Sequence, residues 1–301
     1  MSEPRLIKWT LDTRTLWPEA KETKDLETAS SQNKPKPANR SLEKARRALS
    51  LLTGDERASV ARYYFLKDAK LALASALLKR HVVSSTLGIP FAQATPSRGG
   101  KPAFRLPDSS EPLVFNVSHQ AGLVVLVAAL HAPGVAVGVD VVCPGERRGR
   151  DHELVVRDGW SRYVDMHEGV FAEVECVRLR EMRGGRDELL AYFYALWCLR
   201  EGFVKMTGEA LLAAWLGELE MRHFAPPGEG GELEVWLRGE RVRDVDVRLE
   251  WYLADYMVCT VVRGDVGVDL NGAFEALDLG VLLDDAERSN SLRTGEGAGL
   301  D

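Results

Sequence analysis

Apolar and polar positions along the chain change pattern several times, and each change predicts a different element. Residues 5–17 (RLIKWTLDTRTLW) predict a first strand that runs into a loop. From 41 to 87 the apolar residues recur at helical spacing, with one interruption at a Gly-Asp pair. Gly88 and Pro90 follow this stretch, and such residues commonly stop a helix.

The rest of the chain predicts blocks of strands and blocks of helices. Short β-branched runs between turn residues predict strands, at 113–117, 123–130, 135–142, 218–224, 232–238 and 245–262, the last a hairpin about residues 254 and 255. Helical patterns cover 160–183 and 187–207, whereas 91–112 and the charged stretch 143–159 predict loops. Because strands and helices do not alternate, an α+β fold is favoured over a doubly wound parallel sheet.

Two segments lack a pattern that could build a core. Residues 18–40 are polar and contain three prolines, which predicts a linker or mobile loop. Residues 264–301 lose the periodicity and predict a flexible tail. We therefore expect two α+β halves, an N-terminal half at 1–136 and a C-terminal half at 137–263.

Composition narrows the class of protein. The net charge of −6 and the pI near 5.7 argue against nucleic-acid binding through an overall basic charge. No apolar run reaches the roughly 18 residues needed to span a membrane, and the charged start does not resemble a secretory signal. The four cysteines show no metal or redox spacing. We expect a cytoplasmic protein that binds neither nucleic acid nor membrane.

Two acidic residues in apolar surroundings are candidates for a functional site. Asp140 lies in VAVGVDVV, where a carboxylate is costly unless it is hydrogen-bonded, binds a cation or lies at an exposed strand edge. Glu201 follows Trp197 by four residues and precedes Lys205 by four, so the three share one helix face. Their helix is apolar nearly all round, which is typical of burial, although a solvated Glu–Lys pair is the alternative.

The candidate donors for a bound anion come from several segments. Backbone N–H groups and cations near Gly99-Gly100 suit an anion, although a plain turn is the favoured interpretation of that segment taken alone. The donors that we single out are Lys67, Lys101, His119, Arg200 and Lys205. Two carboxylates together with phosphate oxygens are ligands typical of Mg²⁺. The combination predicts magnesium-dependent chemistry on a ligand that contains a pyrophosphate.

Common catalytic motifs are absent from the sequence. It contains no GxxxxGK[ST] phosphate loop, no GxGxxG after a strand, no HExxH and no GxSxG. Ser118 and His119 are adjacent at the end of the predicted strand 113–117, and because neighbours in a strand point to opposite faces, they do not predict a hydrolase relay.

Four short motifs occur in the order and spacing of a known family. GGKPAF, FNVSHQ, GVDVV and WCLREGFVKMTGEAL resemble the motifs of Sfp-type 4′-phosphopantetheinyl transferases, most closely those of eukaryotic and fungal members. The resemblance covers about residues 5–262. It implies two α+β halves with small antiparallel sheets, related by a pseudo-twofold axis, with coenzyme A bound between them.

The resemblance also implies a reaction and roles for residues. Such enzymes transfer 4′-phosphopantetheine from coenzyme A to a serine of an apo carrier protein and release adenosine 3′,5′-bisphosphate. Asp140 and Glu201 would hold Mg²⁺, Glu201 or a metal-bound water would take the serine proton, and Lys205 would stabilise the phosphates. The residues expected to contact coenzyme A are Lys67, Arg98, Lys101, Pro102, Asn116, Ser118, His119, Arg200 and Lys205.

The chain departs from the family at two of these motifs. Val142 stands where bacterial members often carry an acidic residue, and Arg200 replaces the commoner lysine. The metal site would then have two carboxylates completed by water.

Expected partners are the carrier proteins or domains of fatty-acid, polyketide and nonribosomal-peptide synthases, or of the aminoadipate reductase of lysine biosynthesis. We expect a monomer. We also expect carrier docking on a basic patch formed by Arg147, Arg148, Arg150 and Arg157, and the alternative interpretation of these residues is a solvated charged loop. The rival functions are a non-catalytic coenzyme A or nucleotide-binding module and a scaffold that keeps only the fold.

Overall fold

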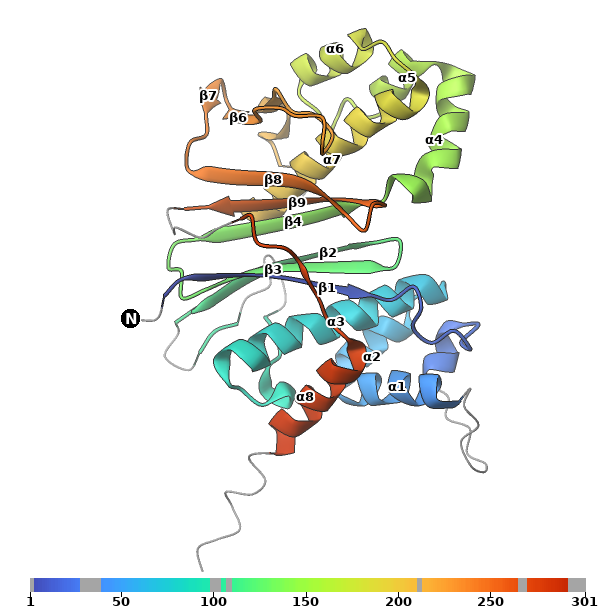
Figure 1. The fold of residues 1–301 in the computed structure, drawn as a ribbon, viewed down its shortest axis with the longest axis vertical. Coiled ribbons are helices and arrows are strands. Elements are labelled where there is room, and N and C mark those ends of the chain that lie inside the picture. Colours follow the sequence, from blue (N-terminus) through green and yellow to red (C-terminus); the bar gives the residue numbers. More distant parts are fainter. Residues whose placement is uncertain are drawn as a thin grey trace, which may run out of the picture. The chain divides into compact units, whose positions relative to one another are not determined.

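The computed structural model divides the chain into two compact units, each with its own sheets and helices. It describes residues 3–27, 39–97, 104–106, 110–209, 213–264 and 270–291, without the side chains of 39–41. The first unit contains Met1–His131 and Asn271–Asp301, and the second contains Ala132–Leu270 (Figure 1). Both units are α+β with small sheets, which confirms the predicted fold class. Among the described residues, no helix is long and apolar enough to cross a membrane.

The first unit packs its helices around one four-stranded sheet. The strand order is β10-β1-β3-β2, with bounds β1 Arg5–Asp12, β2 Leu113–Gln120, β3 Leu123–Leu130 and β10 Glu275–Ala276. The helices are α1 Asn39–Ser50, α2 Gly54–Ala61, α3 Leu66–Leu87 and α8 Leu279–Ser291, with 3-10 turns η1 Thr23–Leu26 and η2 Phe91–Gln93. Every residue of the central strand β3 is buried, as its unbroken apolar sequence requires.

Local signals explain where these helices begin and end. Thr53 caps α2 by accepting a hydrogen bond from the backbone N–H of Glu56, and the carboxylate of Glu56 accepts one from the backbone N–H of Thr53. Gly88 ends α3 in the left-handed conformation at φ 64°, as its sequence position predicts. The predicted linker 18–40 forms η1 with Leu26 buried, then lies outside the described residues from 28 to 38.

The predicted tail is wrong for residues 270–291, which complete the first unit. β10 pairs in parallel with β1, and α8 lies among the helices of that unit (Figure 1). The spacing Leu279, Leu282, Leu283 and Ala286 is that of one helix face, and all four side chains are buried. The charged residues between them hid this pattern. Residues 265–269 and 292–301 lie outside the described part of the chain.

Replacing Leu283 with alanine is expected to lower the free energy of unfolding by about 2–5 kcal/mol, because its fully buried side chain would leave a cavity. Val281 on the same helix is 58% exposed, so Val281→Ala should change stability by less than about 0.5 kcal/mol. Urea denaturation of both variants measures the difference. Equal effects would mean that α8 does not pack as described.

In its described residues, the second unit contains two three-stranded sheets and four helices. One sheet has the order β4-β9-β8 and the other β5-β6-β7. The strands are β4 Ala136–Val142, β5 Leu219–Arg222, β6 Glu234–Leu237, β7 Glu240–Arg241, β8 Val245–Tyr252 and β9 Tyr256–Arg263. The helices are α4 Pro144–Asp158, α5 Trp160–Asp165, α6 Glu173–Glu181 and α7 Arg186–Thr207, with the 3-10 turn η3 Leu216–Glu218.

The charged stretch 143–159 is α4, so its prediction as a loop is wrong. The helix begins with Pro144 at its first turn, a position where the missing N–H of proline costs nothing. Most of its charged side chains face solvent, whereas Asp151 is buried and accepts a hydrogen bond from the hydroxyl of Tyr194 at 2.6 Å. This buried bond to α7 holds a helix that has few apolar residues of its own.

Candidate active site

Two glycines bring β4 and α7 unusually close together. A Cβ atom at Gly138 would lie 2.2 Å from the carbonyl oxygen of Gly202 and 2.5 Å from the backbone nitrogen of Met206. At Gly202 a Cβ would lie 2.8 Å from Sγ of Cys259 on β9. Glycine is required at 138 because backbone atoms occupy the space of any side chain. Asp140 lies two residues beyond this contact, next to the turn of α7 that carries Glu201 and Lys205.

Asp140 forms an ion pair in largely buried surroundings. Its side chain is only 7% exposed, and Nζ of Lys205 donates a hydrogen bond to Oδ1 at 2.5 Å. Sequence spacing predicted that Glu201 and Lys205 share a helix face, and the ion pair shows that Lys205 reaches across to β4. The ion pair with Lys205 explains how the carboxylate of Asp140 is tolerated inside an apolar strand.

Glu201 is the second carboxylate of the site. Burial raises its pKa above the usual range, the negative charge of Asp140 raises it further, and Lys205 opposes both effects. Within the described parts of the chain, Glu201 makes no hydrogen bond or ion pair with a protein group. Its charge is therefore only partly compensated.

The pair of carboxylates suits a divalent cation. Burial raises the pKa of Glu201 and the negative charge of Asp140 raises it further, and a dication beside both carboxylates would offset these effects. No group of three or more His, Cys, Asp or Glu residues with metal-binding geometry occurs in the described ranges. Two protein ligands completed by water and substrate oxygens is the arrangement typical of Mg²⁺.

Arg200 lies beside Glu201 in sequence but is turned into the interior. It is fully buried, and one nitrogen of its guanidinium donates to Oε2 of Glu175 and to the carbonyl of Leu219, both at 2.7 Å. A second nitrogen, Nη2, donates to the carbonyl of Leu216. These bonds connect α7 to α6 and to the start of β5. Because these bonds hold the guanidinium inside the unit, Arg200 is not placed to make the coenzyme A contact that the sequence suggested.

The other candidate residues belong to the first unit or are not described. Asn116 and Ser118 are buried on one face of β2, and His119 is exposed on the opposite face. Lys67 is exposed in the first turn of α3. Arg98, Lys101 and Pro102 lie outside the described residues. The structure thus brings together Asp140, Glu201 and Lys205, all within the second unit.

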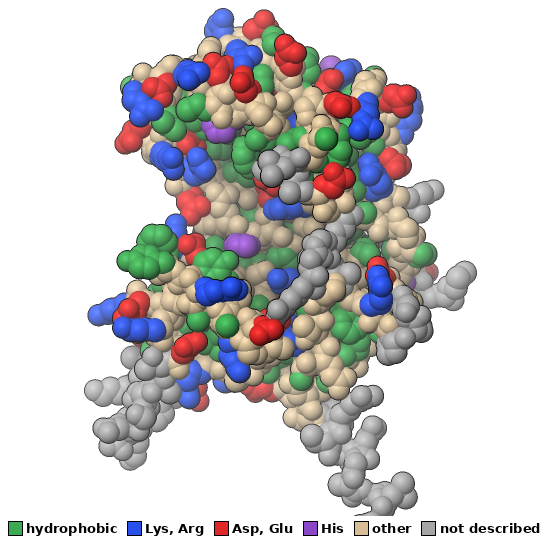
Figure 2. Space-filling view, turned by 180° about the vertical axis from the view of Figure 1, so that it is seen from behind, with side chains coloured by type: hydrophobic (Ala, Val, Ile, Leu, Met, Phe, Trp, Pro, Cys, Tyr) green, Lys and Arg blue, Asp and Glu red, His purple; other side chains and the backbone are tan. Residues whose placement is uncertain are grey.

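The predicted docking arginines lie on α4 rather than in a loop, and three of the four lie beside an acidic residue. Arg148 pairs with Asp187 and Arg157 with Asp158, each at 2.6 Å. Arg147 lies 3.5 Å from the buried carboxylate of Asp151. On the face shown in Figure 2, basic and acidic side chains are likewise intermixed. The geometry therefore favours the alternative of a solvated, charge-balanced surface.

The raised pKa of Glu201 has a consequence for stability. The folded state holds this proton more tightly than the unfolded chain, so stability falls as pH rises from about 4.5 through the folded pKa. Without divalent cations, Glu201→Gln should therefore be more stable than the original protein at pH 8, and the difference should vanish near pH 4. Urea denaturation at both pH values tests this, and an equal difference at both would contradict it.

Comparisons with known proteins identify the family of the chain. The profile of the N-terminal part of 4′-phosphopantetheinyl transferases matches residues 36–131. The chain is 51% identical to 4′-phosphopantetheinyl transferase 1 of Fusarium mangiferae, over 96% of this chain and 98% of that protein. It is 30% identical to a 4′-phosphopantetheinyl transferase of Emericella nidulans, over 87% and 83%. A Schizosaccharomyces pombe L-aminoadipate-semialdehyde dehydrogenase-phosphopantetheinyl transferase is 30% identical over 53% of this chain and 60% of its own length. This chain therefore belongs to the 4′-phosphopantetheinyl transferase family.

Proposed function

We propose that the second unit carries the catalytic centre of a magnesium-dependent transfer of 4′-phosphopantetheine from coenzyme A to a serine of an apo carrier protein. The observation that supports it is the meeting of Asp140, Glu201 and Lys205, brought together by the close contact at Gly138. Family membership supplies the reaction class.

Asp140 and Glu201 are the residues that would hold Mg²⁺. The ion, when bound, would neutralise part of the charge on the coenzyme A pyrophosphate. Lys205 adds a fixed positive charge at the same place, where it can stabilise negative charge that develops on the leaving phosphate.

Glu201 is the proposed general base. The acceptor serine oxygen forms a new bond to the phosphorus of the pantetheine arm, and the bond from that phosphorus to the bridging oxygen of adenosine 3′,5′-bisphosphate breaks. The serine proton passes to the carboxylate of Glu201, which is the role that the resemblance to the family implies for this residue.

Residues of the first unit are proposed to bind the rest of coenzyme A. Exposed His119 and Lys67 are proposed to contact its phosphates, and Asn116 and Ser118 are polar residues on the other face of β2. Arg98, Lys101 and Pro102 complete this proposal from the sequence motifs alone.

The proposed acceptors are acyl and peptidyl carrier domains of fatty-acid, polyketide and nonribosomal-peptide synthesis, and of lysine biosynthesis. The last is suggested by the Schizosaccharomyces pombe relative, whose name refers to aminoadipate-semialdehyde dehydrogenase. We propose a monomer that acts in the cytoplasm.

The decisive experiment incubates the purified protein with Mg²⁺, coenzyme A and several apo carriers. Mass spectrometry should show a carrier mass gain of one phosphopantetheine, and chelation of the divalent ion should abolish it. Coenzyme A binding without any carrier modification would instead support the rival function of a non-catalytic binding module.

A further inference from the structure

A groove runs along β8 in the second unit, on the side where the sheet β5-β6-β7 lies. It consists of two adjoining pockets of about 410 Å³ and about 280 Å³, which share Leu233 and Val247 in their walls. None of its lining residues belongs to the site of Asp140, Glu201 and Lys205. The groove is therefore a separate surface of the same unit.

One wall of the groove is a strand edge. In the sheet order β4-β9-β8, the strand β8 is at the end, and its register in the described residues pairs it with β9 alone. Val245, Val247 and Leu249 alternate along it, are partly buried, and line the two pockets in succession. An edge strand presents backbone N–H and C=O groups that can pair with another extended chain.

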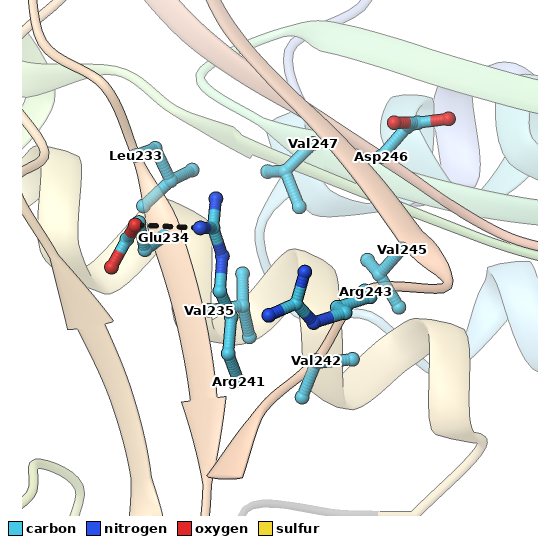
Figure 3. A pocket seen from close by; sticks show the side chains of 9 residues that line it. All are labelled: Leu233, Glu234, Val235, Arg241, Val242, Arg243, Val245, Asp246 and Val247. Atoms are coloured by element: carbon cyan, nitrogen blue, oxygen red, sulfur yellow. Dashed lines mark ion pairs between the residues drawn. The ribbon is translucent and has the colours of Figure 1, made fainter.

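Two arginines and two acidic residues line the larger pocket. Figure 3 shows the guanidinium groups of Arg241 and Arg243 turned into the space between the strands, whereas the carboxylate of Asp246 lies on the far side of β8. Glu234 pairs with Arg241 at 3.0 Å. Arg243 makes no ion pair or hydrogen bond with any residue that the structure describes. One cation thus remains available above an apolar floor of Leu233, Val235, Val242, Val245 and Val247.

We propose that this groove binds an acidic, extended segment of a partner polypeptide, which adds a strand to the edge of β8. Side chains of an added strand alternate between two sides. Its carboxylates would lie on the pocket side and reach Arg243 and Arg241, whose planar guanidinium groups bind carboxylates with paired hydrogen bonds, and the intervening apolar residues would point to the opposite side of the sheet. Residues 245–249 give an edge of roughly 17 Å, enough for about five residues of the partner.

The probe for this proposal is a fluorescein-labelled ten-residue peptide in which glutamate and valine alternate. Its binding to the full chain is followed by fluorescence anisotropy at low salt, without Mg²⁺ or coenzyme A, so that the result is independent of transferase activity. We expect saturable binding, and a second peptide with proline in place of each valine should bind at least about fivefold more weakly, because proline lacks the N–H that pairs with β8.

Arg243→Gln should weaken binding of the glutamate–valine peptide by about fivefold to tenfold, the effect expected from loss of one charge-assisted hydrogen bond. Arg238→Gln is the matched control. Arg238 is an exposed arginine between β6 and β7 that pairs with Glu218, and it lines neither pocket. The proposal is overturned by absence of binding, by equal affinity for the proline peptide, or by equal effects of the two substitutions.

Discussion

Replacing Glu201 with glutamine is expected to reduce carrier modification by at least about a hundredfold, with the fold intact. Glutamine keeps the size of the side chain but can neither accept the serine proton nor bring a negative charge to a divalent ion, and general base catalysis alone is typically worth 10²–10⁴ in rate, roughly. The measurement is the initial rate of carrier modification by mass spectrometry, at saturating Mg²⁺ and coenzyme A, with denaturation curves on the same samples.

Glu153→Gln provides the control for this prediction. Glu153 is an exposed glutamate of α4, so its replacement removes one negative charge from the same unit without touching the site. Its rate should match that of the original protein. A Glu201→Gln variant that works at a near-normal rate would remove Glu201 from the mechanism and leave the family assignment standing.

Replacing Gly138 with alanine is expected to affect both stability and activity. The added Cβ would overlap the backbone of α7 at Gly202 and Met206, and a backbone cannot rotate away as a side chain can. Overpacking of this kind costs about 1–3 kcal/mol of unfolding free energy. Because β4 must then move away from α7, the distance between Asp140 and Glu201 should increase and the Mg²⁺ concentration for half-maximal activity should rise.

Gly149→Ala separates this steric effect from the general effect of a glycine replacement. Gly149 lies within α4 with open space around it, so alanine there should be neutral or should stabilise the helix by up to about 1 kcal/mol. Urea denaturation and a Mg²⁺ titration of activity measure both variants. If Gly138→Ala behaved like Gly149→Ala, the close contact between β4 and α7 could not be what positions the acids.

The sequence predicts the elements of this fold well where apolar spacing is regular. β2, β3, β4 and the hairpin of β8 and β9 all lie where β-branched runs predicted them, and α3 ends at the predicted glycine. The prediction fails at α4, which is rich in charged residues, and at α8, where charged residues interrupt the apolar spacing. The predicted helix 160–183 is divided into α5 and α6. In α4 the partner of Asp151 is a tyrosine 43 positions away, which no local pattern can indicate.

The sequence also predicts some features of the candidate site and misses others. It indicates the carboxylate of Asp140 within an apolar run and the helix face that Glu201 and Lys205 share. It does not indicate the inward direction of Arg200, because a helix that is apolar on all sides gives no sign of which face meets solvent. The role of Gly138 had one signal, since a glycine inside a strand often marks close approach of another backbone.

The ribosome synthesises the first unit in two parts, one before and one after the second unit. Strand β10 and helix α8 are translated after the whole second unit, yet they supply an outer strand and buried leucines to the first. The nascent N-terminal region therefore emerges with an incomplete core and has to wait, exposed to chaperones and to aggregation, until its final segment is released. A premature stop codon just after residue 264 would then damage most severely the part of the protein made first.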